Sequence, residues 1–412
     1  MSDHLLPSYE SCNADTPVFV RGHGSEIETT QRSFLDFLCG AYCSAMLGHG
    51  DRDVRKAMMR GFSADLIGGL HQPALDLAAE LCSRTGYARV SYGTSGSEAA
   101  DAAIRMVYQC QRTAGYGKDG KSIFVTLKNG FHGTTLATLT TSGFRRRAET
   151  LPAPVETRIL GPWVTDPAIG STEQAREALA AEAVEREGLW PHVGGFLFEP
   201  IQGVAGIRSV NPHCYRVIAE RCREHGVLIV ADEITTGVGR TGRFLASETF
   251  EPRPDIVLLG KALTNGEFPL SAVLITEEVW RKLDGMSDDP SEKYLFGSTF
   301  AGHPTGCLAA LAVLKKLDAK KMAWITTLGE MTGALLGRLR QYQAVRAIRG
   351  VGLMWGIELR DAHESAAVVA ELLRSGIRCS AEGKVLVIFP NLRMNTELLQ
   401  LVERLQEILA VR

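Results

Sequence analysis

Two charged side chains, Asp232 and Lys261, each follow an apolar run that has the character of a buried parallel strand. The runs cover 227–231 and 256–259, and their unbroken hydrophobicity is typical of strands covered on both faces. Open α/β sheets bind ligands outside the carboxyl ends of their strands, so we expect the two groups to share one crevice. A lysine and a carboxylate so placed can serve an aldehyde cofactor: the lysine forms a Schiff base and the carboxylate keeps a ring nitrogen protonated.

Each residue also has a plainer interpretation when it is taken alone. An acidic residue after a strand is usually a helix cap, and a lone lysine is usually solvated. Buried ionisable groups mark functional sites only in a minority of cases. The neighbouring motifs must therefore decide between the two interpretations.

The segment 89–99 reads as a short strand, a loop of small residues and the start of an alanine-rich helix. Small residues such as Gly96 and Ser97 let the backbone approach an anion, and free N–H groups at a helix start hold a phosphate. A plain serine-capped helix explains the same loop. Both interpretations remain open on this segment alone.

Two further strands are predicted to end in polar groups at the same edge of the sheet. Phe131 and His132 follow the strand 122–127, and Glu199 follows the strand 194–198. An aromatic residue beside an imidazole is more often packing than function. The helix that begins at Pro212 leads from the second strand to the run at 227, which predicts a βαβ unit.

The segment 115–122 matches the phosphate-binding pattern GxxxxGK[ST], with Lys121 as its lysine. Such a loop needs a strand before it and a helix after it, because the helix N-terminus completes the phosphate site. Here a helix precedes the segment and a strand follows it. We therefore reject a P-loop NTPase on context.

Composition limits the classes of partner. The chain has 412 residues and a formal net charge of -2, so no basic field attracts nucleic acid or an anionic membrane, and we expect a small-molecule partner. Nine cysteines without a CxxC pair argue against a disulfide framework or a metal site. Without a leader pattern or an apolar run of about 18 residues, we expect a soluble cytoplasmic protein.

The pattern of elements predicts three segments. Residues 1–50 contain short strands with turn residues between them, 51–317 alternate strands and helices, and 318–412 mix helices with short strands. The change of pattern near residue 318 indicates a separate α+β unit. We expect a large domain over 51–317 and a small one that includes both terminal segments.

Six motifs in order carry a resemblance that covers nearly the whole chain. They are 93–99 (GTSGSEA), 131–133 (FHG), 199–203 (EPIQG), 232–242 (DEITTGVGRTG), 260–266 (GKALTNG) and 298–304 (STFAGHP). The chain resembles the class III (ω-type) aminotransferases, which are fold-type I pyridoxal-phosphate enzymes. The resemblance implies an α/β fold: a large domain with a mixed, mostly parallel sheet between helices, and a small α+β domain.

The resemblance also implies roles for the two charged groups. Lys261 would form the Schiff base with pyridoxal 5'-phosphate and then move a proton as general base and acid. Asp232 would pair with the pyridinium nitrogen and strengthen the ring as an electron sink. Thr235 would lie beside the cofactor, at a position where the family often has glutamine.

Further residues would complete the cofactor and substrate sites. Gly96 and Ser97 would hold the phosphate, and Phe131 would stack on the ring. His132 and Glu199 would line the pocket. Thr299 would reach the phosphate of a neighbouring subunit, which implies a homodimer with shared active sites.

One departure from the family concerns the substrate. Many relatives carry an arginine in the C-terminal strand that binds the α-carboxylate of the substrate with two hydrogen bonds. Val387 stands at that position, so Arg393 is a candidate to hold a carboxylate instead. Glu199 would then lack its usual cationic partner and be available to an ammonium or hydroxyl group of a substrate.

The sequence thus predicts an aminotransferase that moves an amino group from an amine or amino-acid donor to a carbonyl acceptor by ping-pong half-reactions. An aminomutase or epimerase of the same family is the alternative with the same cofactor, and a non-catalytic homologue is a third possibility. Retention of both Lys261 and Asp232 argues against the last. The natural donor and acceptor depend on side chains from loops and from the second subunit.

Overall fold

The computed structural model describes residues 18–61, 69–111, 120–144, 152–285 and 297–412. Its centre is a seven-stranded sheet. In spatial order the strands are β4 (Arg89–Gly93), β12 (Ser271–Ile275), β11 (Ile256–Leu259), β10 (Leu228–Asp232), β7 (Val193–Phe198), β5 (Ile123–Leu127) and β6 (Thr157–Leu160). β12 is antiparallel to both of its neighbours, and the pairs from β11 to β6 are parallel. The predicted mixed, mostly parallel sheet is confirmed.

The apolar runs at β10 and β11 are explained by cover on both faces. Val230 belongs to an apolar cluster shared with α3 (Gly96–Gln111), whereas the next residue, Ala231, belongs to a cluster shared with α8 (Pro212–Glu224). Successive strand residues point to opposite faces, so a strand with helices on both faces must be apolar at every position.

The unit β7–α8–β10 forms as predicted, with its two strands paired in parallel. Its helix begins where the sequence indicates. The Asn211 side chain accepts a hydrogen bond from the His213 N–H at 2.9 Å, and Pro212 occupies the first turn, where its missing N–H is not needed.

The remaining helices of this part of the chain surround the sheet. They are α1 (Arg52–Gly61), α2 (Gln72–Thr85), α4 (Leu136–Thr141), α6 (Thr172–Ala180), α7 (Ala183–Arg186), α9 (Glu277–Asp284) and α10 (Pro304–Lys316). Short helical turns are η3 (Pro162–Thr165), η4 (Trp190–His192), η5 (Ala246–Thr249) and η6 (Lys261–Thr264). α10 packs against both α1 and α2. Within the described residues, no helix is long and apolar enough to span a membrane.

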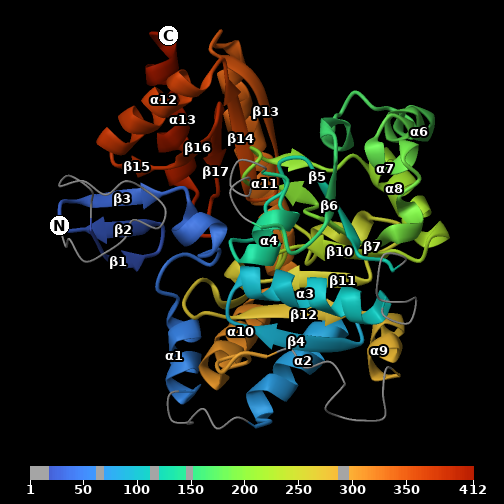
Figure 1. Cartoon of the computed structure of the whole chain (residues 1–412). Coiled ribbons are helices and arrows are strands. Elements are labelled where there is room, and N and C mark those ends of the chain that lie inside the picture. The colour runs from blue at the N-terminus through green and yellow to red at the C-terminus, as the bar shows by residue number, and fades with distance from the viewer. Residues whose placement is uncertain (1–17, 62–68, 112–119, 145–151, 286–296) are drawn as a thin grey trace.

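The two ends of the chain meet in a second sheet. The predicted short strands near the N-terminus are β1 (Phe19–His23), β2 (Glu26–Thr29) and β3 (Ser33–Asp36), which form an antiparallel meander, and β15 (Ile377–Arg378) pairs in parallel with β3. Figure 1 shows these three strands beside the C-terminal helices.

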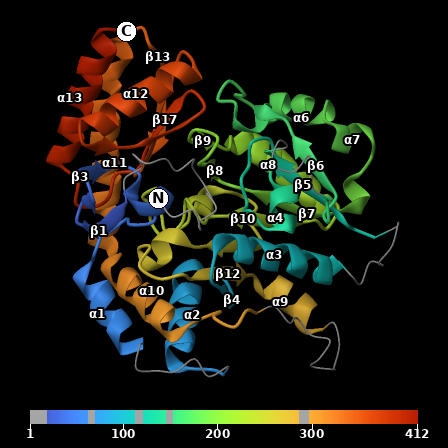
Figure 2. The same cartoon turned by 60° about the vertical axis from the view of Figure 1, so that its left-hand side comes forward.

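A third sheet orders β13 (Val345–Val351), β14 (Met354–Leu359), β17 (Val385–Ile388) and β16 (Ser380–Glu382). The helices of this region are α11 (Ala319–Gly337), α12 (Ala362–Arg374) and α13 (Thr396–Ala410), with the turn η7 (Arg338–Gln341). Figures 1 and 2 place α12 and α13 at the opposite end of the molecule from α1 and α2. The domain boundaries at 50 and 317 stay a prediction.

The environment of Lys121 excludes the P-loop interpretation in the described part of that segment, which starts at residue 120. The ammonium group donates to the backbone oxygens of His225 and Gly226, just beyond the C-terminus of α8. There it stabilises the last carbonyl groups of a helix. β5 begins two residues later, so no helix N-terminus follows the lysine.

Arg240 joins the loop after β10 to both terminal segments. Its side chain is fully buried; Nη1 donates to the Pro390 carbonyl oxygen at 2.9 Å and Nη2 to the Cys43 carbonyl oxygen at 2.6 Å. Two distant segments of the chain thus share one guanidinium group.

Replacing this guanidinium should destabilise the fold. We expect Arg240→Met to lower the free energy of unfolding by about 3 kcal/mol, because two buried carbonyl groups lose their donor. Urea unfolding followed by circular dichroism measures the change. Arg243→Met is the matched control, since Arg243 is exposed in the same loop. Equal midpoints for the two variants would contradict the bridging role.

Candidate active site

Asp232 and Lys261 lie at the carboxyl ends of adjacent parallel strands. Asp232 is the last residue of β10 and pairs with Leu258 of β11, and Lys261 opens η6 two residues after β11 ends. Lys261 has a φ of 44°, in the left-handed region. A residue with a Cβ occupies that region at a cost of roughly 1–2 kcal/mol, so the surrounding turn must hold it there. The predicted juxtaposition at one sheet edge is therefore present.

The amine of Lys261 faces a hydroxyl group and an aromatic ring. Nζ donates to Thr235 Oγ1 at 2.7 Å and lies 5.2 Å from the centre of the Tyr42 ring. No carboxylate among the described residues forms an ion pair with this amine. Thr235 follows β10 by three residues, so the loop that carries Asp232 also orients Lys261.

The Asp232 carboxylate is buried and held by two contacts. Oδ2 lies 2.8 Å from His132 Nδ1, and Oδ1 accepts a hydrogen bond from the Ile234 N–H at 3.1 Å. His132 is itself held, since its Nε2 lies 3.2 Å from Thr126 Oγ1. Each carboxylate oxygen has a second lone pair, so Asp232 can still accept from a ring N–H.

The first turn of α3 provides a site suited to an anion. The N–H groups of Gly96 and Ser97 donate no hydrogen bond within the described residues. A Cβ on Gly96 would lie 2.9 Å from Ile234 Cδ1, so a side chain would fill the space beside these donors. Helix N-termini with free N–H groups bind phosphate. Ser97 Oγ accepts from the Thr134 N–H at 3.1 Å, which fixes the neighbouring loop.

Glu199 is a buried carboxylate with only backbone donors. Oε2 accepts from the Phe131 N–H at 2.9 Å and Oε1 from the Gly203 N–H at 3.2 Å, and the residue is 4% exposed. Burial raises the pKa of Glu199 to about 7; nearby His132 acts in the opposite direction, and the Asp232 charge adds to the increase. Within the described residues no cation forms an ion pair with it.

The Glu199 hairpin packs against the surroundings of Lys261. The hairpin consists of β8 (Ile201–Gln202) and β9 (Arg208–Ser209). A Cβ on Gly203 would lie 3.4 Å from Thr235 Cγ2 and 3.5 Å from Tyr42 Cε1. Gly203, whose N–H donates to Glu199, therefore packs against Thr235, whose hydroxyl accepts from Lys261.

Tyr42 is a site residue that the sequence patterns did not reveal. It lies in η1 (Cys39–Cys43), a distorted turn where Tyr42 itself has a φ of 57°. Burial first, and then the nearby carboxylates of Glu382 and Glu199, raise the pKa of the Tyr42 hydroxyl. In the sequence, Tyr42 stands out only as a single aromatic residue between Gly40 and Gly48, and such residues usually belong to the packed core.

Val387, at the position where an arginine was expected, is fully buried in β17 and opposite Gly356 of β14. Its apolar cluster consists of Cys39, Cys43, Ala45, Ile201, Ile207, Met354, Val387 and Phe389, with Leu38 and Tyr42 packed against it. The wall beside Tyr42 is therefore apolar.

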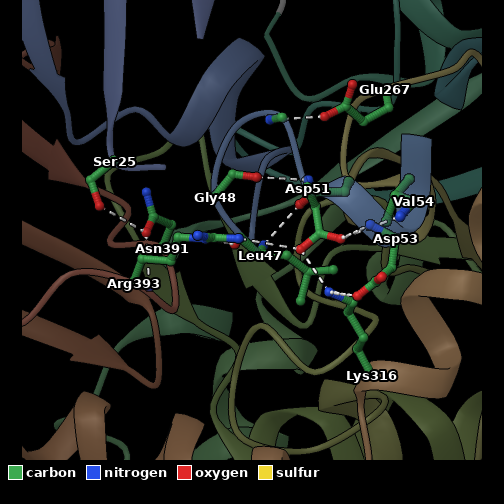
Figure 3. Close-up of polar contacts among 12 residues, drawn as sticks. Ser25, Leu47, Gly48, Asp51, Asp53, Val54, Glu267, Lys316, Asn391 and Arg393 are labelled. Carbon is green, nitrogen blue, oxygen red and sulfur yellow. Dashed lines mark hydrogen bonds and ion pairs between the residues drawn. The ribbon is translucent and has the colours of Figure 1, made fainter. Parts of the chain in front are cut away.

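Arg393 belongs to a different hydrogen-bond network (Figure 3). Its Nε donates to the Leu47 carbonyl oxygen at 2.9 Å, and Nη2 lies 3.4 Å from Asp51 Oδ2. Asp51 also accepts from Lys316 at 2.8 Å. None of the hydrogen bonds that Arg393 makes to described residues reaches Lys261, Asp232 or Glu199. Its role in substrate binding stays a prediction and would require these contacts to open.

Thr299 is exposed in the loop between 297 and 303, and its neighbour Ser298 hydrogen-bonds to Glu98 in the first turn of α3. The structure thus brings together Lys261, Asp232, His132, Thr235, Phe131 and Glu199, with Gly96 and Ser97 at the adjoining helix start. These groups fit pyridoxal phosphate. The amine suits its aldehyde, the carboxylate with a free lone pair suits its ring nitrogen, and the helix N-terminus suits its phosphate.

Comparisons with known proteins identify the family of the chain. The model of the family "Aminotransferase class-III" matches residues 11–409. An acetylornithine aminotransferase of Methanothermobacter thermautotrophicus is 34% identical over 330 residues, which are 78% of this chain and 75% of the relative. Ornithine aminotransferase 1 of Staphylococcus aureus is 30% identical over 93% of this chain and 92% of its own length.

Solved structures give the same result. An amine transaminase from an uncultivated Pseudomonas species, in a PLP-bound form, superposes with a TM-score of 0.89 at 25% identity and covers 100% of this chain and 99% of its own. The omega transaminase of Pseudomonas jessenii in complex with PMP gives 0.88 at 26% identity, with 98% and 96% coverage. The chain belongs to the class III aminotransferases, which depend on pyridoxal phosphate.

Proposed function

We propose that this aminotransferase takes an amino group from a primary amine or ω-amino acid and delivers it to a carbonyl acceptor in two half-reactions at one site. Lys261 and Asp232 are its catalytic residues. The observation that supports the proposal is the position of both residues at the carboxyl ends of the adjacent strands β10 and β11, with each side chain held by its own partner.

The choice of donor is supported by the kinds of relative. Several of the similar structures are named omega or amine transaminases, and several relatives are named ornithine aminotransferases. The apolar wall around Val387 adds to this support, since no guanidinium stands there to bind an α-carboxylate. A donor without a carboxylate beside the transferred nitrogen suits that wall best.

In the proposed mechanism the residues act on protons. Bound pyridoxal phosphate supplies a carbonyl group that accepts the amine and a ring that withdraws electrons from the carbon being deprotonated. Lys261 Nζ takes the proton from that carbon and returns it in the next step, while the Thr235 hydroxyl orients the amine. Asp232 holds the proton of the ring nitrogen, and His132 keeps the carboxylate in place.

We also propose a cytoplasmic homodimer with shared active sites. Thr299 and Phe300 are exposed, and the oxygen of Gly302 in the same loop lies 2.8 Å from His71 Nε2 at the start of α2. Leu70, just before that helix, is 81% exposed. An exposed apolar region of this kind is typical of an interface. Thr299 would then contact the phosphate bound by the partner subunit.

The first test is spectroscopic. Purified protein loaded with pyridoxal phosphate should show the visible band of a lysine-bound cofactor, and Lys261→Ala should lose it after dialysis, because Lys261 carries the amine of the proposed cofactor site. Lys121→Ala is the matched control and should keep the band, since its amine contacts the end of α8. A band that survives in Lys261→Ala would contradict the assignment.

The second test is kinetic. With an amine donor and an oxo-acid acceptor, we expect parallel double-reciprocal lines, because one product leaves before the second substrate binds. Lys261→Ala should lower kcat by about a thousandfold or more, in the range of general acid–base catalysis. Catalytic turnover of one substrate without any acceptor would instead indicate an aminomutase or epimerase.

The third test concerns the dimer. Thr299→Ala should weaken cofactor retention, so its activity should be low at limiting cofactor. If sites are shared, dissociating and mixing it with Lys261→Ala forms hybrid dimers with one intact site. Random reassociation then restores about a quarter of the wild-type activity. No gain on mixing would show that Thr299 serves its own subunit.

A further inference from the structure

Glu199 is a buried charge whose partners are incomplete. Each carboxylate oxygen accepts one backbone N–H, and each has a lone pair to spare. Burying a carboxylate is unfavourable unless hydrogen bonds or a cation compensate for the lost water. The described residues supply hydrogen bonds but no ion-pair partner, so a cation bound from outside the chain would complete the site.

The surroundings decide what kind of group can approach. Among the described residues, the amine of Lys261 faces Thr235 and the imidazole of His132 faces Asp232, and neither forms an ion pair with Glu199. Glu199 and Glu382 both raise the pKa of the Tyr42 hydroxyl, in addition to burial, so two carboxylates lie near that hydroxyl. A second carboxylate on a substrate would be repelled from this region.

The rest of the wall is apolar. Ile201, two residues after Glu199, shares an apolar cluster with Val387 and Met354. Apolar walls with a few placed polar groups are typical of small-molecule sites, where the polar groups set specificity. Glu199 is a polar group in this part of the described site that can accept a hydrogen bond from a substrate.

We infer that Glu199 determines the specificity for the amino donor, and that it selects donors with a second hydrogen-bond donor group, above all a second ammonium as in a diamine. The inference rests on the proposed function, because it requires that amines enter at Lys261. A site that hydrogen-bonds a substrate group rejects analogues without that group, since the buried partner is left unpaired.

Binding of a second ammonium should depend on pH, because it requires the negative charge of Glu199. Burial raises the pKa of this carboxyl to about 7, so the group gains its negative charge as the pH rises through neutrality. Aliphatic ammonium groups stay protonated there, because their pKa is near 10. Binding of a second ammonium should therefore strengthen from pH 6 to pH 8. The other titratable groups nearby are His132 and Asp232, which act on the Glu199 charge, and Glu382 and Lys261, which lie near Tyr42.

The experiment compares donors of equal length on the holoenzyme. Diamines of three to five carbons, the corresponding monoamines, the amino alcohols and the ω-amino acids are each tested with one oxo-acid acceptor. At pH 8 we expect kcat/KM for the best diamine to exceed that of its monoamine by about tenfold or more, the usual effect of a charged hydrogen bond. Amino alcohols should lie between them and ω-amino acids should be poorest.

The pH and a variant then isolate Glu199. The ratio of diamine to monoamine should fall several-fold at pH 6, and Glu199→Gln should bring it close to one and remove its pH dependence. Glu382→Gln is the matched control, because it removes a carboxylate near Tyr42 and leaves the Phe131 and Gly203 contacts intact. An equal effect of both variants would overturn direct contact with Glu199.

The outcomes separate this inference from the proposed function. Turnover of monoamines and diamines with equal kcat/KM at both pH values would overturn the inference and leave the aminotransferase proposal standing. Absence of turnover with every amine would overturn the proposed donor class, and the inference with it. If Glu199→Gln does not fold, the comparison at two pH values with the unchanged protein still decides.

Discussion

The parallel pairing of β10 with β11 is the constraint on which the site depends. It places Asp232 opposite Leu258 and so brings the lysine three residues further on to the same edge. A shift of one residue would move the lysine by roughly 3.3 Å and turn every side chain of the strand to the opposite face. Both faces are packed against helices, so such a shift would bury the wrong surfaces. The apolar packing of the two strands thereby fixes the positions of Asp232 and Lys261.

The pocket walls depend on contacts between distant parts of the chain. Tyr42 comes from the N-terminal segment and Val387 from the C-terminal one, and the pairing of β3 with β15 holds these segments together. Asn265, at the end of the lysine turn, accepts from the Leu47 N–H and donates to the Gly48 oxygen, each at 2.8 Å. The turn that carries Lys261 is thus attached to the same segment as Tyr42. Any movement of the terminal segments would change the walls and the lysine together.

Local patterns predicted the elements well, because strand burial and helix capping leave marks in neighbouring residues. The apolar run before Asp232 and the cap at Asn211 are examples. Side-chain contacts that depend on tertiary packing produce no such pattern in the sequence. Arg393 pairs with Asp51 because the two ends of the chain meet, and Tyr42 faces Lys261 because a distorted turn orients it. Neither fact follows from the spacing of residues along the chain.

The two carboxylates of the site differ in ways that suit different tasks. Asp232 has a hydrogen-bonded imidazole at 2.8 Å, whose other nitrogen is held in turn, so its position is fixed from within the protein. The hydrogen bonds that Glu199 accepts from described residues come from backbone N–H groups, and burial raises its pKa to about 7. Two carboxyl groups with such different surroundings in one site commonly have separate roles. A group with a permanent partner suits a cofactor that stays bound, whereas a group with an incomplete set of partners suits a substrate that comes and goes.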